Sequence, residues 1–457
     1  MSEKVEFIDT TLRDGQQSVW ALGMRTSWML PALQYLDGAG FDSIEFYVPV
    51  VQLKKMVQDL QENPWHWLEL GTSLAKKTVL RLHGHGQGLS HMHKSIEDLL
   101  GQKVVERGIT VVRTSISPWN DYDEIKDDVA DLQNMGMKVV LNLIYSVSPR
   151  HTDEYFVSRA KAAAALKPYR ICLKDVGGLL KPERVRELMP KILPVIGNIP
   201  LELHTHSTNS LSLLNVMEAV KHGVRYIHTA VPPLASGTSQ PSVFSVARNL
   251  KELGYEVDVD LSALEAVKEH FTYIAKQENL PVGELMEYDE RLYKHQVPGG
   301  MMGTLRFHLK QVGAKHSLDE VLDEVVRVRT DFGYPIMVTP LSQFVGTQSV
   351  LNVAMGEQYK VVPDEVIHYA LGHWGKEAIE VMDPKVRAKI LDRPRARELE
   401  KWKPPSRSLD ELRKEFGQGL TDEELILRMY VNEEAVKIAR QAPIPKPFFT
   451  PAIPQFK

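Results

Sequence analysis

The stretch YRICLKDVGGLLKP, which runs from Tyr169 to Pro182, is an apolar segment that carries Lys174 and Asp175 just before two glycines. A segment this apolar is expected to form a buried strand. Burying a lysine without a partner costs several kcal/mol or removes its charge. The segment therefore predicts a strand whose end lies beside a group that requires an amine.

Seven other apolar or β-branched segments resemble this strand. The eight candidates are KVEFIDTTL (4–12), SIEFYVPV (43–50), TVLRLHGHG (78–86), ITVVRTSIS (109–117), KVVLNLIYS (138–146), YRICLKDVG (169–177), PLELHTHST (200–208) and YIHTAVPPL (226–234). Amphipathic stretches with apolar residues three and four positions apart lie between them, as in DEIKDDVADLQNMG (123–136). Strand then helix, repeated over roughly 250 residues, predicts an α/β protein with a (β/α)8 TIM barrel.

Polar residues gather where these strands end. They are Asp9, Arg13 and Asp14 after the first strand, His83 and His85 after the third, Lys174 and Asp175 after the sixth, and His204 and His206 after the seventh. All of them fall at carboxyl ends of strands, and that face of a TIM barrel carries the chemistry. The pattern predicts one active site at the barrel mouth.

His204 and His206 lie two positions apart on one strand, so their side chains point to the same side. Two imidazoles beside the carboxylate of Asp14 predict a divalent-metal site. For Lys174 the residues leave three interpretations open. It is a carbamate that binds the metal, a lysine that forms a Schiff base, or the partner of Asp175 in an ion pair.

Composition and charge narrow the class of protein. Of the 457 residues, 43% are hydrophobic and 25% charged, and the net charge is -4, which gives no basic footprint for nucleic acid. The one cysteine, Cys172, is expected to be a core residue in a reducing compartment. Without a signal peptide or a long apolar run, we expect a cytoplasmic protein with no membrane span.

The strand rhythm stops near Val257, and the later sequence is mostly helical. We predict four parts: a barrel over 1–257, a helical domain covering its mouth over 258–400, a small helical unit over 401–442, and a proline-rich extended arm over 443–457. The arm is expected to be disordered or to lie on a partner surface.

Six segments stand in the order seen in one known family. They are FIDTTLRDGQQS (7–18), CLKDVGGLLKP (172–182), LHTHSTN (203–209), SGTSQPS (236–242), PGGMMGTL (298–305) and VTPLSQFVG (338–346). Over residues 5–442 the chain resembles the carboxyltransferase domain of pyruvate carboxylase and the alpha subunit of oxaloacetate decarboxylase. These are members of the metal-dependent lyase barrel superfamily, and transcarboxylase is similar.

The resemblance implies a divalent metal, whether zinc, manganese or cobalt, held by Asp14, Lys174 as its carbamate, His204 and His206. It places Arg13 and Gln17 beside the substrate oxygens. It also makes Thr339 the residue that passes a proton between the substrate carbon and biotin. A threonine before a proline that begins a helix can also be a plain N-cap.

The chain departs from the family pattern at the substrate. His83 stands where the family has an arginine that grips the keto-acid carboxylate, and an imidazole is a weaker partner than a guanidinium. Arg81, two residues earlier, is the candidate to compensate, and Ser207 replaces a usual aspartate. We therefore expect an acceptor other than pyruvate, or one bound differently, with His83, Arg81 and Gln17 as its contacts.

The chain has no AMKM biotinylation sequence. The resemblance then implies that biotin arrives on a separate biotin carboxyl carrier protein, together with a biotin carboxylase subunit, and that the barrels form a homodimer. Two alternatives remain. One is an acyl-CoA-dependent Claisen-type synthase or lyase of the same superfamily, and the other is a non-catalytic scaffold subunit.

Overall fold

The computed structural model describes residues 3–84, 93–114, 122–123, 125–302, 305, 309, 317–375 and 379–455. Eight parallel strands close into a barrel in sequence order, which confirms the predicted fold class. The strands are β1 (Glu6–Asp9), β2 (Ser43–Tyr47), β3 (Val79–His83), β4 (Val111–Thr114), β5 (Lys138–Ile144), β6 (Arg170–Asp175), β7 (Leu201–Thr205) and β8 (Tyr226–Thr229).

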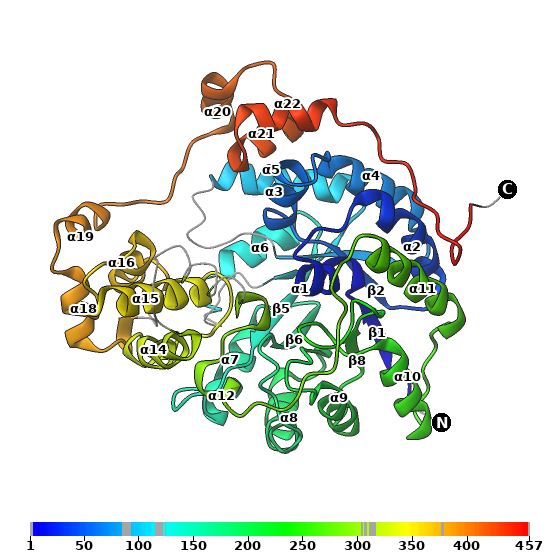
Figure 1. Cartoon of the computed structure of the whole chain (residues 1–457), viewed down its shortest axis with the longest axis horizontal. Coiled ribbons are helices and arrows are strands. Elements are labelled where there is room, and N and C mark those ends of the chain that lie inside the picture. The colour runs from blue at the N-terminus through cyan, green and yellow to red at the C-terminus, as the bar shows by residue number, and fades with distance from the viewer. Residues whose placement is uncertain are drawn as a thin grey trace.

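Helices surround the barrel (Figure 1). They are α2 (Thr26–Gly38), α3 (Val51–Gln58), α4 (Pro64–Leu74), α5 (Lys94–Glu106), α6 (Lys126–Asn134), α7 (Asp153–Ala165), α8 (Pro182–Ile196), α9 (Ser212–Lys221) and α10 (Val243–Glu252). Each buries an apolar face. In α10, for example, Val243, Val246, Ala247 and Leu250 are buried. These faces and the outer sides of the strands form the large core.

The strand register determines which side chains meet inside the barrel. Lys174 on β6 pairs with His204 on β7, and Ile144 on β5 pairs with Lys174. Residues two apart on a strand share a face. Cys172 therefore lies below Lys174, and Glu202 lies below His204, on the faces that line the interior.

The barrel interior holds both apolar and charged side chains. Val111, Val140 and Cys172 form a small apolar cluster there. Burial raises the pKa of the Cys172 thiol to about 12, which agrees with its predicted core role. Fully buried charged side chains adjoin this cluster, because Arg113 pairs with Val140 and Glu202 with Cys172 across neighbouring strands. We call these side chains the charged layer: Glu45, Arg81, Arg113 and Glu202.

A second core lies beside the barrel. α11 (Leu261–Gln277) still packs on α2 and belongs to the barrel core. The second core draws on buried residues between Val297 and Leu399. Its helices form a lobe on the left of Figure 1: α14 (Leu318–Asp331), α15 (Leu341–Met355), α16 (Asp364–Leu371), α18 (Pro384–Leu391) and α19 (Pro394–Leu399).

The end of the chain returns to the barrel. α21 (Asp422–Tyr430) packs on α5 and α22 (Glu433–Gln441) packs on α3, while α20 (Leu409–Phe416) precedes them. The arm over 443–455 is extended and lies on α2 and α11. The Phe448 amide donates to the Ser27 carbonyl, the Thr450 hydroxyl donates to Nδ1 of His270 over 2.9 Å, and Ile453 is buried. The arm is therefore ordered against its own chain.

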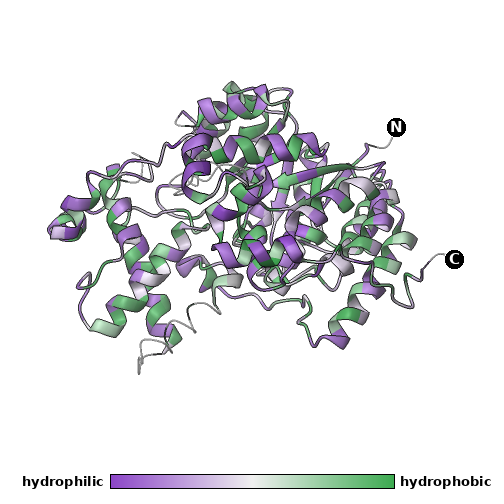
Figure 2. Cartoon of the chain, turned by 90° about the horizontal axis from the view of Figure 1, so that it is seen from above, coloured by the Kyte–Doolittle hydropathy of each residue, from purple (hydrophilic) through white to green (hydrophobic). Residues whose placement is uncertain are grey.

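Hydrophilic and hydrophobic residues alternate along the helices (Figure 2). This is the pattern of helices with one buried and one exposed face. Within the described residues, every helix is too short or too polar to span a bilayer.

Candidate active site

A tight turn after β1 positions two of the expected site residues. The segment Thr11–Gly15 forms a single π-helical turn, η1, which is followed by α1 (Gln16–Trp20). The Thr10 amide and hydroxyl both donate to the carbonyl of Thr229 on β8, which fixes the start of this turn. Arg13 and Asp14 are thereby held buried at the barrel mouth.

Three of the four predicted metal ligands converge. Oδ2 of Asp14 lies 3.3 Å from Nε2 of His204 and 3.2 Å from Nε2 of His206, and the two Nε2 atoms are 3.2 Å apart. Ligands bound to one divalent metal at about 2.0–2.2 Å lie about 3 Å from each other, so the three atoms fit a shared ion. Nδ1 of His206 donates to the Thr238 carbonyl over 2.6 Å, which leaves its Nε2 unprotonated toward the site.

Lys174 lies next to this cluster in a buried, cationic setting. Burial, and then Arg113 and Arg13, lower the pKa of Lys174 to about 7. Its Nζ is 3.2 Å from Nε2 of His83. A large fraction of the amine is therefore neutral and nucleophilic near pH 7.

The structure contradicts the ion pair between Lys174 and Asp175. The Asp175 carboxylate accepts hydrogen bonds from the amides of Leu179 and Leu180 and from the hydroxyl of Thr205. Among the described residues it forms no salt bridge with Lys174. Asp175 orders the loop after β6, and Lys174 pairs in register with His204 beside the cluster of Asp14, His204 and His206.

Glu45 is the centre of the charged layer beneath the site. Its carboxylate accepts hydrogen bonds from three guanidinium groups, those of Arg13, Arg81 and Arg113. Burial opposes ionisation, but Arg113, Arg13 and Arg81 hold the pKa of Glu45 well below its usual range. Arg13 also donates to Oδ1 of Asp14 over 2.8 Å, so the layer directly supports a predicted metal ligand.

The predicted substrate contacts differ in accessibility. Arg81 is fully buried and donates to Glu202 and Glu45, which favours a structural role over the predicted substrate contact. Gln17 is exposed and its Oε1 accepts from Arg13 over 3.3 Å. Burial, and then Arg113, Lys174 and Arg13, lower the pKa of His83 well below its usual range, so its imidazole is neutral. His85 lies outside the described residues.

Thr339 lies on a segment that packs against the strand ends. Ile336 and Val338 contact Ile144 at the end of β5, and Val176 packs against them. α15 begins at Leu341 with Pro340 as its N-cap and no side-chain cap, so the interpretation of Thr339 as a capping residue is wrong. Its side chain is exposed.

Sequence reasoning missed several residues of the site. Gln240, in the loop after β8, donates to Oδ2 of Asp14 over 2.9 Å and lies 3.2 Å from Nε2 of His204. The motif SGTSQPS contains it, but no role followed from the motif. Four buried residues behind the site were also missed: Glu45, Arg113, Glu202 and His228. Their polar side chains within apolar strands were the sequence feature that could have identified them.

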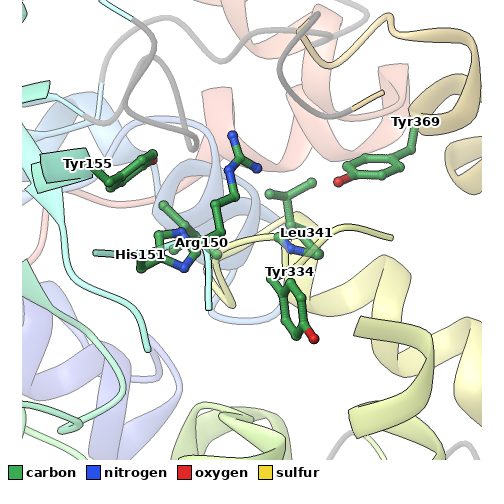
Figure 3. A pocket seen from close by; sticks show the side chains of 8 residues that line it. Arg150, His151, Tyr155, Tyr334, Leu341 and Tyr369 are labelled. Atoms are coloured by element: carbon green, nitrogen blue, oxygen red, sulfur yellow. The ribbon is translucent and has the colours of Figure 1, made fainter. Parts of the chain in front are cut away.

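A small pocket lies at the junction between the barrel and the lobe. Arg150 and His151 from the loop after β5, and Tyr155 from α7, face Tyr334, Leu341 and Tyr369 of the lobe across it (Figure 3). Arg329 of α14 bridges the same junction, because it donates to the Ser146 hydroxyl and to the carbonyls of Val147 and Pro335. This junction fixes the lobe beside the barrel mouth.

Two family models match the chain. The HMGL-like model covers residues 4–270, and a conserved carboxylase domain covers residues 292–442. The barrel model alone is compatible with the Claisen-type alternative. The second match, over the lobe and the returning helices, agrees with the carboxylase resemblance.

The relatives and the solved structures that match the chain are also carboxylases or carboxyltransferases. A pyruvate carboxylase subunit of Methanocaldococcus jannaschii is 34% identical over 85% of this chain and 68% of that protein. The methylmalonyl-CoA carboxyltransferase 5S subunit of Propionibacterium freudenreichii is 32% identical over 84% and 76%. The carboxyl transferase domain of Rhizobium etli pyruvate carboxylase, solved with pyruvate and biocytin, has a TM-score of 0.84 at 21% identity, over 96% of this chain and 77% of that one. The chain therefore belongs to the carboxyltransferases of biotin-dependent carboxylases and is an enzyme of that class.

Proposed function

We propose that the chain transfers a carboxyl group between carboxybiotin, carried by a separate protein, and the enolate form of a small acceptor. The observation that carries this proposal is the convergence of Asp14, His204 and His206 on one point at the barrel mouth. A divalent metal held there would polarise an acceptor oxygen and stabilise the developing negative charge. Zinc, manganese and cobalt all suit this donor set.

The residues of the chain have distinct roles in this proposal. Arg13 is held by Glu45 and Asp14, and with the exposed Gln17 it orients the acceptor oxygens. The hydroxyl of Thr339 moves a proton between the acceptor carbon and the carboxyl carrier. Supporting this role, its side chain is exposed and its segment packs on the ends of β5 and β6. A positioned proton donor of this kind contributes about 10²–10⁴-fold.

Charge balance supports a carbamate on Lys174. Four buried arginines, Arg13, Arg81, Arg113 and Arg170, are paired with four carboxylates, those of Asp14, Asp42, Glu45 and Glu202. A dication would leave this balanced layer with an excess of positive charge, and an ammonium at Lys174 would add to it. A neutral amine that adds to CO2 forms an N–C bond and releases one proton, which converts Lys174 to an anionic oxygen ligand.

The carbamate can be observed directly. Protein equilibrated with ¹³C-bicarbonate should show one slowly exchanging carbamate carbon signal, and Lys174→Met should remove it. Lys138→Met, at an exposed position at the start of β5, is the control and should retain the signal. A wild-type spectrum without the signal, from protein that binds metal and is active, would overturn this part of the proposal.

We propose further that the acceptor is not pyruvate, or that pyruvate is bound differently from the family pattern. The support is the neutral, partly buried His83 beside Lys174, because an imidazole offers one hydrogen bond in place of a charged fork. Relatives named for other acceptors, such as the 2-oxoglutarate carboxylase large subunit of Hydrogenobacter thermophilus at 31% identity, are compatible with this.

The test is a carboxyl-transfer assay with a carboxylated carrier protein and a panel of acceptors that includes pyruvate, 2-oxoglutarate and acyl-CoA thioesters. We expect a turnover with one other acceptor that exceeds the turnover with pyruvate. Efficient use of pyruvate would exclude an acceptor other than pyruvate. A biotinylated chain and a biotin carboxylase are the expected partners in a pull-down, and sedimentation of the pure chain tests the proposed homodimer.

A further inference from the structure

A third histidine lies directly behind the cluster of Asp14, His204 and His206. His228 on β8 is fully buried, and its Nδ1 lies 3.0 Å from Nδ1 of His204. On the other side of its ring, Nε2 lies 2.9 Å from Oε2 of Glu202. The three side chains thus form a hydrogen-bonded series that runs from Glu202 in the charged layer, through His228, to the proposed metal ligand His204.

The proton positions in this hydrogen-bonded series follow from the carboxylate of Glu202. Glu202 also accepts from Arg81 through both of its oxygens and from Arg170, and a carboxylate held by two guanidinium groups in this way is ionised. An ionised carboxylate can only accept hydrogen bonds. Nε2 of His228 therefore carries a proton and donates it to Glu202.

Arg81 does not compete for this assignment, although its Nη2 lies 3.0 Å from Nε2 of His228. That Nη2 group has two hydrogens, and it lies 3.1 Å from Oε1 of Glu45 and 3.1 Å from Oε2 of Glu202. Both hydrogens are thus directed at carboxylates. Nε2 of Gln240 is an amide donor and lies 3.2 Å from Nε2 of His204, so that nitrogen of His204 accepts. The proton of His204 is then on Nδ1, and it faces the lone pair on Nδ1 of His228.

We infer that His228, oriented by Glu202, is a positioning residue that sets the tautomer of His204. Because Nδ1 of His228 accepts, Nδ1 of His204 must donate. Nε2 of His204 then presents its lone pair to the point where Asp14 and His206 converge. An acceptor behind a metal-binding imidazole fixes the orientation of that ring and raises its basicity. The inference rests on the metal site of the proposed function.

The same neighbourhood does not suit a second metal, although Cys172, Glu202 and His228 lie close enough to share an ion. The oxygens of Glu202 are already engaged by Arg81 and Arg170, and Nε2 of His228 donates to Glu202. Burial raises the pKa of the Cys172 thiol to about 12, so the thiolate is not available. The cluster therefore acts as support for His204.

Three substitutions separate the two nitrogen positions of His228. His228→Asn places an acceptor oxygen where Nδ1 stood, His228→Gln retains a donor only near Nε2, and His228→Leu removes both. The affinity of each purified variant for Zn²⁺ is measured by competition with a chromophoric chelator. We expect His228→Asn to stay close to wild type and the other two to bind about 10–100-fold more weakly. Equal affinity in all four proteins, or loss in Asn and retention in Gln, would overturn the inference.

A measurement on the unsubstituted ring decides the case if the variants fold poorly. In protein labelled with ¹⁵N-histidine, an N–H···N hydrogen bond gives a scalar coupling between the two Nδ1 nitrogens. His373→Gln removes the pair His368 and His373, whose Nδ1 atoms also face each other at 2.7 Å, and leaves the barrel intact. The coupling should persist in this background with the proton on His204, and its absence would contradict the inference. Wild-type protein that shows the coupling but binds no metal would instead contradict the proposed metal site.

Discussion

The Nε2 atoms of His204 and His206 lie 3.2 Å apart and both face Oδ2 of Asp14. Three acceptors at this separation repel one another unless a cation or a proton lies between them. Arg13 and Gln240 each donate to Asp14, but neither places a charge in the space between the two imidazoles. A divalent metal at the point where the three atoms converge would remove this repulsion.

Asp14→Asn therefore tests the metal site with little change of shape. We expect metal affinity to fall by more than the about 10–100-fold typical of changes to residues that only support a ligand, and carboxyl transfer to fall with it. Metal content by mass spectrometry and the transfer assay measure the two effects. His222→Ala, at the residue that caps the carboxyl end of α9 beside Glu218, is the control and should keep its metal. Full metal content in Asp14→Asn would exclude this site.

Thr339→Ala tests the proton transfer. We expect kcat for carboxyl transfer to fall about 10²–10⁴-fold because the hydroxyl is lost. Metal content and melting temperature should not change, since the side chain is exposed and does not cap α15. Thr339→Ser should restore most of the rate, and Thr330→Ala on the exposed side of α14 should have none of these effects. A fully active Thr339→Ala enzyme would remove this residue from the mechanism.

Glu45→Gln tests the charged layer. The substitution leaves Arg13, Arg81 and Arg113 with one fewer negative charge in a fully buried position. Breaking a buried ion pair by removing one partner costs about 3–5 kcal/mol, so the unfolding midpoint should fall strongly. Glu69→Gln removes an exposed partner of Arg107 and should cost at most about 1 kcal/mol. Similar midpoints for the two variants, measured by urea unfolding, would show that the arginines find other partners.

The sequence could predict the barrel because each strand has an apolar signal and each helix an amphipathic one. It could also predict Asp14, His204 and His206, since polar residues at carboxyl strand ends share one face of a barrel. The charged layer could not be predicted from the sequence. Glu45 and Arg113 look like isolated charges within apolar strands, and only the strand register brings them together.

The path of the chain after the barrel was harder to predict for a different reason. Helical periodicity shows that a face is buried but not what buries it. Leu412, Leu425 and Val436 therefore gave no sign that the last helices return to the barrel core. Likewise, nothing in the proline-rich arm indicated that Thr450 meets His270.

His151 makes the junction between barrel and lobe sensitive to acid. Burial, and then Arg329 and Arg150, lower its pKa from 6.5 to about 3. The unfolded chain takes up a proton between these two values and the folded chain does not. Above pH 6.5 His151 is neutral in both states and does not affect the free energy of unfolding. On acidification from pH 6.5 toward pH 3, proton uptake by the unfolded chain lowers that free energy by up to about 1.4 kcal/mol per pH unit.

His151→Asn isolates this effect, because its Oδ1 can still accept the hydrogen bond that the Ser148 hydroxyl donates to Nδ1 over 2.6 Å. The variant does not titrate, so its unfolding free energy should fall less steeply than that of wild type between pH 6.5 and pH 4. Other buried histidines are common to both proteins and cancel in the comparison. Parallel curves in urea unfolding would show that His151 is protonated equally in the folded and unfolded chains.

A protonated His151 would add a charge beside Arg329, which joins the lobe to the barrel, so we expect the lobe to detach first in acid.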